Sequence, residues 1–221
     1  YLLSNERPTV GQAMTAIQAL RRAGRTAQAD RLTLDVIIGP LTNAGLYRTL
    51  LGEWLPPILN SPDKQTRGQA LGQGGKLLLH LGDFKQALPV LQESLAIQQE
   101  IGDKAGEGAT LNNISTLYHA QGEYATALEY LKKSLTIQQE IGDKAGEGTT
   151  LNNISQIYDA QGEYATALEY LKKSLAIMQE IGDKKGEGAT LNNISQIYDA
   201  RGDYATALEY LKKSLAIMQE I

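Results

Sequence analysis

The chain contains no cysteine, which excludes disulfide bonds, thiolate metal sites and cysteine nucleophiles. It also has no run that approaches the roughly 18 consecutive apolar residues of a membrane-spanning helix, so we expect no contact with membranes. The first residues lack a basic segment followed by an apolar stretch, and no secretion signal is recognised. These absences together predict a cytoplasmic protein.

The chain also lacks an excess of positive charge, and histidine is rare. The net charge is −4, which argues against a dedicated nucleic-acid surface. The two histidines, His80 and His119, have no metal-binding or nucleophilic constellation around them. Residues 70–77 superficially resemble a phosphate loop, but the segment lacks the first glycine and the Ser or Thr after Lys76. We therefore predict no enzyme activity, no metal and no cofactor.

What the chain does contain is repetition. A 40-residue sequence occurs three times, starting at Gly102, Gly142 and Gly182. The last two copies differ at only four positions, which are 145/185, 149/189, 161/201 and 163/203. A fixed period in this range is typical of stacked supersecondary units rather than of one globular core.

Each copy carries two helical patterns. In the first copy, Leu111, Ile114, Ser115 and Tyr118 form one amphipathic stripe, and Tyr124, Ala127, Leu128, Leu131 and Leu135 form the second. Gly122 and Gly142 are expected to end the helices, and Asp143 is a good N-cap for the next one. Ala127 and Ser115 are small, so we expect the two helices to approach closely there.

The pattern Leu-x-x-Ile-Ser-x-x-Tyr, followed by Gly-Glu-Tyr-x-x-Ala and Leu-x-x-Ser-Leu, resembles the tetratricopeptide repeat, here lengthened to 40 residues. The repeat sequence is similar to the long repeats of kinesin light chains, of Leu-Gly-Asn-type adaptors and of bacterial signalling proteins. The resemblance implies an all-α fold, a right-handed superhelix of stacked antiparallel helix pairs, and a role in protein binding.

The repeats predict the organisation of the chain. Residues 102–141, 142–181 and 182–221 are three repeats, and 62–101 is a diverged fourth copy. Residues 1–61 are rich in arginine and proline, and are expected to form an irregular helical cap or degenerate repeat. We interpret the chain as a piece of a longer protein. The helix over 204–221 has no polar capping helix after it, so we expect apolar surface there and possible end-to-end self-association.

The resemblance implies that the first helix of each repeat lines a concave groove that binds a peptide. The expected groove positions are Asn112, Asn113, Thr116 and His119, then Asn152, Asn153, Gln156 and Asp159, then Asn192, Asn193, Gln196 and Asp199. Asn and Gln supply paired donors and acceptors for an extended main chain. For Asn113, Asn153 and Asn193 an alternative stays open, in which they cap or bridge adjacent helices.

Charge indicates the kind of partner. Residues 102–221 carry a net negative charge, and Asp159 and Asp199 lie among the groove positions, so a neutral or basic segment is expected. We predict a non-enzymatic scaffold that binds a protein or peptide segment. The alternative is a ligand-sensing or regulatory arm of a larger signalling NTPase or repeat-linked protease, whose enzyme would lie outside this chain.

Overall fold

The computed structural model describes residues 9–220, and every regular element among them is a helix. Contacts divide the chain into two compact units, Tyr1–Gly106 and Glu107–Ile221, which are called the N-terminal and C-terminal units. The all-α prediction of successive antiparallel helix pairs is confirmed. The prediction for the cap at 1–61 includes residues 1–8, which lie outside the described residues.

The N-terminal unit begins with short elements and ends with one long pair. Its elements are α1 (Val10–Arg22), α2 (Thr26–Leu32), the π-helix η1 (Thr33–Ile38), α3 (Gly39–Asn43), α4 (Tyr47–Thr49), the π-helix η2 (Leu50–Trp54), α5 (Pro56–Leu59), α6 (Lys64–His80) and α7 (Phe84–Ile101). A proline follows within two residues of each π-helix. Proline has no N–H and clashes with the carbonyl four residues earlier, which disfavours a regular α-helix at both places.

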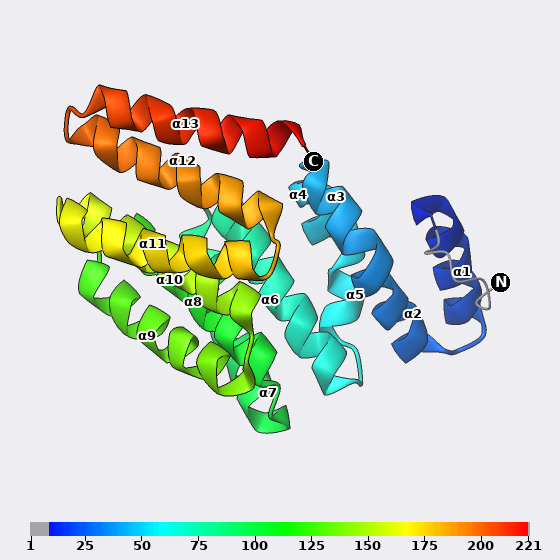
Figure 1. Cartoon of the computed structure of the whole chain (residues 1–221). Helices are drawn as coiled ribbons and strands as arrows, with labels where there is room; N and C mark the ends of the chain where they lie inside the picture. The colour runs from blue at the N-terminus through cyan, green and yellow to red at the C-terminus, as the bar shows by residue number, and fades with distance from the viewer. Residues whose placement is uncertain (1–8, 221) are drawn as a thin grey trace. The chain divides into compact units, whose positions relative to one another are not determined.

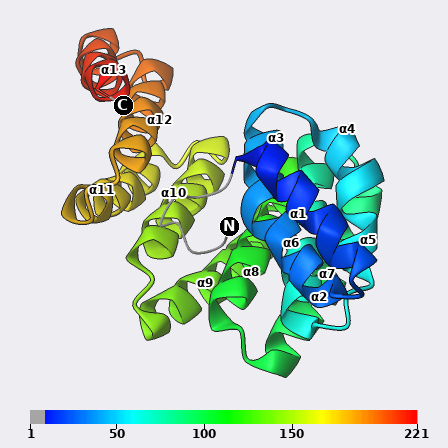
Figure 2. The same cartoon turned by 90° about the vertical axis from the view of Figure 1, so that its right-hand side faces the viewer.

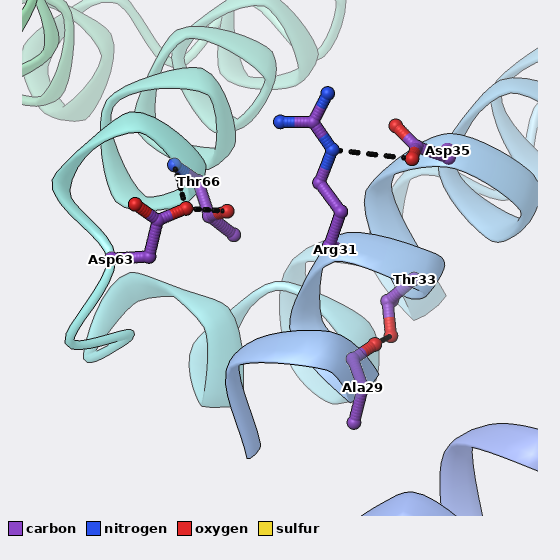
Figure 3. A network of polar contacts seen from close by, with 6 residues as sticks. All are labelled: Ala29, Arg31, Thr33, Asp35, Asp63 and Thr66. Atoms are coloured by element: carbon purple, nitrogen blue, oxygen red, sulfur yellow. Dashed lines mark hydrogen bonds and ion pairs between the residues drawn. The ribbon is translucent and has the colours of Figure 1, made fainter. Parts of the chain in front are cut away.

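Local polar contacts hold the short elements of this unit. The Thr33 hydroxyl donates to the Ala29 carbonyl at 2.8 Å, and Arg31 pairs with Asp35 at 3.2 Å (Figure 3). Asp63 caps α6 by accepting hydrogen bonds from the amide and the hydroxyl of Thr66. The hydroxyl bond is the main reason that the pKa of the Asp63 carboxyl lies below its usual range.

The C-terminal unit consists of the near-identical repeats. Its helices are α8 (Lys104–Ala120, which belongs to this unit from Glu107 on), α9 (Tyr124–Ile141), α10 (Lys144–Ala160), α11 (Tyr164–Glu180), α12 (Lys184–Ala200) and α13 (Tyr204–Gln219). Both views show α12 and α13 as a pair that lies side by side (Figure 1, Figure 2). Gly142 has φ 69°, and the Asp143 side chain accepts a bond from the Gly146 amide, so the predicted helix stop and N-cap are confirmed.

A hydrogen bond between serine and glycine joins the two helices of each repeat. The Ser174 hydroxyl donates to the Gly148 carbonyl at 2.8 Å, and the same bond joins Ser134 to Gly108 and Ser214 to Gly188. The diverged repeat has it too, from Ser94 to Gly68. A Cβ on Gly148 would lie 2.6 Å from the Met178 Cε, the far end of a flexible side chain, whereas a Cβ on Gly108 would meet no atom closer than 3.6 Å.

The sequence predicted close approach at Ala127 and Ser115. Ala127 is fully buried, as expected. Ser115 is buried as well, but its hydroxyl donates to the Asn112 carbonyl in its own helix at 2.6 Å. The glycine and serine that bind the two helices together were not predicted.

A second polar contact fixes the turn between repeats. The buried Glu147 accepts hydrogen bonds from the Gln139 amide at 2.9 Å and from Lys144 at 2.8 Å. The bond from Lys144 is the main reason that the pKa of Glu147 lies below its usual range. Glu187 repeats the arrangement with Gln179 and Lys184.

The apolar surface predicted on the last helix is present. On α13, Leu211 is 46% exposed, whereas the equivalent Leu171 of α11 is fully buried. The same stripe includes Tyr204, Leu208, Leu215 and Met218, all of which are exposed. The stripe corresponds to the face of α11 that packs against α12.

The Ser174–Gly148 bond provides a test of the helix pairing. Replacing Ser174 by Ala removes a buried donor and is expected to lower the free energy of unfolding by about 1 kcal/mol. Thr149→Ala is the control, because Thr149 is exposed and the next copy has Ala189 at that position; it should change stability by less than about 0.5 kcal/mol. Urea unfolding followed by circular dichroism measures both, and equal stabilities would contradict the role given to Ser174.

Candidate peptide-binding face

The predicted groove positions lie on α8, α10 and α12, the first helices of the three repeats. They form two rows. The asparagines at 112, 113, 152, 153, 192 and 193 make the first row, here called the asparagine row. Thr116, His119, Gln156, Asp159, Gln196 and Asp199 make the second, here called the outer row. The two rows differ in burial and in hydrogen bonding.

Asn112 is part of a buried polar network. Its side chain is buried, and its Nδ2 donates to the Ser134 Oγ at 3.1 Å and to the Thr150 Oγ1 at 2.5 Å. The Thr150 hydroxyl in turn donates to the Gln138 Oε1 at 2.6 Å. The expectation of a solvated groove side chain is therefore wrong for Asn112, because both protons of its amide are bonded inside the protein.

The other asparagines connect neighbouring repeats. The Asn153 Nδ2 donates to the Asn112 Oδ1 at 2.9 Å, and the Asn193 Nδ2 donates to the Asn152 Oδ1 at 2.8 Å. For Asn153 and Asn193 the bridging alternative thus describes the structure. Among the described residues, the half-buried side chains of Asn113 and Asn192 have no hydrogen-bond partner.

Four of the six residues of the outer row are exposed, whereas the asparagine row is buried or half-buried. Gln156 and Gln196 are exposed, and within the described part of the chain their side chains form no hydrogen bond. Thr116 is also exposed, but its hydroxyl donates to the Asn112 carbonyl at 3.2 Å. Two free amide groups therefore stand at equivalent positions of successive repeats.

The remaining positions of the outer row are titratable. Partial burial raises the pKa of the Asp159 carboxyl and lowers the pKa of the His119 imidazole, which keeps the imidazole neutral at pH 7. The His119 ring also contacts Tyr124, with 5.8 Å between ring centroids. Asp199 is exposed. The row thus offers amide donors and acceptors flanked by carboxylates.

Sequence reasoning did not find the network partners Ser134, Gln138 and Thr150. One signal was available, because the serine and the threonine recur together with the asparagine in the three near-identical copies. No group of three or more metal-ligating side chains occurs in residues 9–220. None of the described helices is long and apolar enough to cross a bilayer.

The repeats supply a matched pair of asparagines for a test. Asn112→Ala should lower the free energy of unfolding by about 1–3 kcal/mol, because it leaves buried polar groups without partners. Asn192→Ala, at the equivalent position two repeats later, should cost less than about 0.5 kcal/mol. Urea denaturation of both variants measures the difference, and an equal loss in the two would contradict the assignment of Asn112 to the network.

Comparison with known proteins agrees with this architecture. The family model described as Tetratricopeptide repeat matches residues 67–140, 107–180 and 146–220. No curated protein sequence matches the chain. Among solved structures, BtubC (BKLC) from P. vanneervenii is similar, with 18% identity, a TM-score of 0.75, and coverage of 96% of this chain and 90% of that one.

Two further solved structures are similar to the chain. A Rap protein complexed with competence and sporulation factor has 14% identity and a TM-score of 0.77, over 86% of this chain and 55% of that chain. A signal transduction ATPase with a tetratricopeptide repeat sensor, from Pyrococcus horikoshii, has 19% identity and a TM-score of 0.68, over 95% of this chain and 34% of that one. At these identities the similarity establishes the fold alone.

Proposed function

Because the chain belongs to the tetratricopeptide repeat family, we propose that it is a non-enzymatic scaffold that binds a segment of another protein. The binding surface is the outer row on α8, α10 and α12. The partner lies along it as an extended segment, whose backbone N–H and C=O groups bond to the glutamine side chains.

The observation that carries this proposal is the difference between the bonded asparagines and the two free glutamines. The amides of Asn112 and Asn153 are already bonded within the protein, whereas those of Gln156 and Gln196 are exposed and free among the described residues. Breaking a buried network to bind a partner would leave polar groups unsatisfied, at a cost of about 1–3 kcal/mol each. The free glutamines can bond to a partner without that cost.

Charge supports a neutral or basic partner. Asp159 and Asp199 flank the glutamines, and residues 107–220 contain more acidic than basic side chains. An acidic segment would be repelled by these carboxylates, whereas a lysine or arginine could pair with them. The carboxylates are therefore expected to govern selectivity for partners, and the glutamines to hold the backbone.

The test starts from peptides of a random displayed library that are selected for binding to the wild-type chain. Binding of a selected peptide should fall about tenfold or more in the double variant Gln156→Ala, Gln196→Ala, since two hydrogen bonds to the partner are lost. Fluorescence anisotropy measures the affinity, and circular dichroism checks that helicity is retained.

Thr149→Ala, which is exposed and outside the outer row, is the control and should bind normally. Asp159→Asn with Asp199→Asn should lower affinity for basic peptides more than for neutral ones. Unchanged binding by the glutamine double variant would overturn the proposed surface.

The regulatory-arm alternative rests on the irregular, arginine-rich segment at 1–61. It is compatible with the same binding surface, because a sensor also has to bind its ligand. The distinguishing feature is a catalytic domain elsewhere in a longer polypeptide, and the sequence of the complete gene decides it.

We also propose that α13 mediates self-association of this chain. The exposed residues Tyr204, Leu208, Leu211, Leu215 and Met218 follow alternating steps of four and three, which is the spacing of a coiled-coil seam. Two copies can pair these stripes about a two-fold axis.

Light scattering after size-exclusion chromatography should give a dimer for the wild type and a monomer for Leu211→Gln with Leu215→Gln. A monomeric wild type at about 100 μM would contradict this proposal.

A further inference from the structure

Stacked tyrosines fill the space between repeats in the C-terminal unit. Tyr158 and Tyr170 stack with 5.5 Å between ring centroids, and the pairs Tyr118–Tyr130 and Tyr198–Tyr210 repeat this arrangement. Tyr158 and Tyr170 pack against the core cluster of Leu131 and Ile154, which joins one repeat to the next. Two tyrosine rings and one isoleucine therefore lie at the contact between two successive repeats.

The diverged repeat at 62–101 has lost all three of these side chains. Forty positions before Tyr118, Tyr130 and Ile114 stand Leu78, Val90 and Gly74. Each change makes the side chain smaller. A Cβ built on Gly74 would be in ordinary contact with the Leu55 Cδ1 at 3.6 Å and the Val90 Cγ1 at 4.0 Å, so these two side chains pack over the glycine.

The result is a cleft in the N-terminal unit with a volume of about 520 Å³, within the usual range of ligand pockets. Its walls are aliphatic, from η2 and α5 on one side and from α6 and α7 on the other. They are formed by Leu51, Leu55, Leu59, Gly74, Leu78, Leu81 and Val90, with Arg48, Asp83 and Gln86 at the edge. Short π-helices such as η2 are frequent at functional sites.

Of the three polar side chains at the edge of the cleft, Asp83 and Gln86 are bonded to each other, and Arg48 has no partner among the described residues. Asp83 accepts hydrogen bonds from the Gln86 amide nitrogen at 3.2 Å and from the Gln86 Nε2 at 2.7 Å, so both side chains serve the cap of α7. Arg48 is exposed, and among residues 9–220 it forms no ion pair. A positive charge therefore stands beside an aliphatic cleft.

We propose that this cleft binds a small molecule with an aromatic ring system and a negatively charged substituent. The equivalent space in each of the later repeats holds two stacked tyrosine rings, so the space between these helices accommodates flat aromatic groups. The acidic substituent pairs with Arg48 at the edge of the cleft. This site is separate from the outer row of α8, α10 and α12 and does not depend on the function proposed for that row.

Two fluorescent probes with the same rings test the proposal. Anilinonaphthalene sulfonate carries a negative charge, and N-phenyl-1-naphthylamine is neutral. The full chain should bind both probes. Leu78→Tyr with Val90→Tyr restores the residues of the other repeats and should weaken both about tenfold or more. Gly74→Ile should do the same, and thermal melts measure whether both variants stay folded at the assay temperature.

Two further variants test the role of the Arg48 charge and the extent to which the probes bind to the apolar stripe of α13. Arg48→Gln should weaken the sulfonate probe about two- to fivefold and leave the neutral probe unchanged. Leu211→Gln with Leu215→Gln disrupts the apolar stripe of α13 and should leave unchanged the probe binding that Leu78→Tyr with Val90→Tyr weakens. Probe binding that survives in the filled variants would overturn the site. Displacement of the neutral probe by decanoate at lower concentration than by 1-naphthoate would overturn the aromatic preference.

Discussion

The hydrogen bond from a serine to a glycine carbonyl sets the distance between the two helices of every repeat in this protein. It occurs at the same place four times, from Ser94 to Gly68 through Ser214 to Gly188. The serine side chain is short, and its hydroxyl reaches the carbonyl of the facing helix at 2.7 Å in both of these repeats. In the C-terminal unit, this approach also brings Ser134 within reach of Asn112. The alignment of polar groups within the stack depends on it.

Because of that alignment, some polar side chains of the first helices are bonded within the protein, and others remain free to bind a partner. Asn112 faces the neighbouring helices and is buried, whereas Gln156 faces outward and is free among the described residues. Because an unmade buried hydrogen bond costs more than an exposed one gains, the asparagine network is fixed by folding itself. The two rows lie about one helical turn apart. The bonded asparagines therefore hold in place the helices that carry the free glutamines. Such support is what a binding surface needs in order to hold a partner in a defined register.

Much of this architecture could be predicted from the sequence because it is local. The helix stop at Gly142, the cap at Asp143 and the apolar stripe on α13 follow from short-range patterns and appear as predicted. The role of Asn112 could not be predicted in this way, since its partners Ser134 and Thr150 are 22 and 38 residues away. The aliphatic cleft is visible only when Gly74, Leu78 and Val90 are compared with the later copies and the structure shows the space left open. The π-helices near Pro40 and Pro56 had no sequence signal of comparable strength.

Hydrogen exchange of the side-chain amides, observed by NMR, tests the central claim most directly. In the free protein, the Nδ2 protons of Asn112, Asn153 and Asn193 should exchange slowly, because they are bonded between repeats. The Nε2 protons of Gln156 and Gln196 should exchange at the rate of exposed amides and become protected when a selected peptide binds. Fast exchange at Asn112 in the free protein, or no change at either glutamine on binding, would contradict the division between asparagines bonded within the protein and glutamines free to bind a partner.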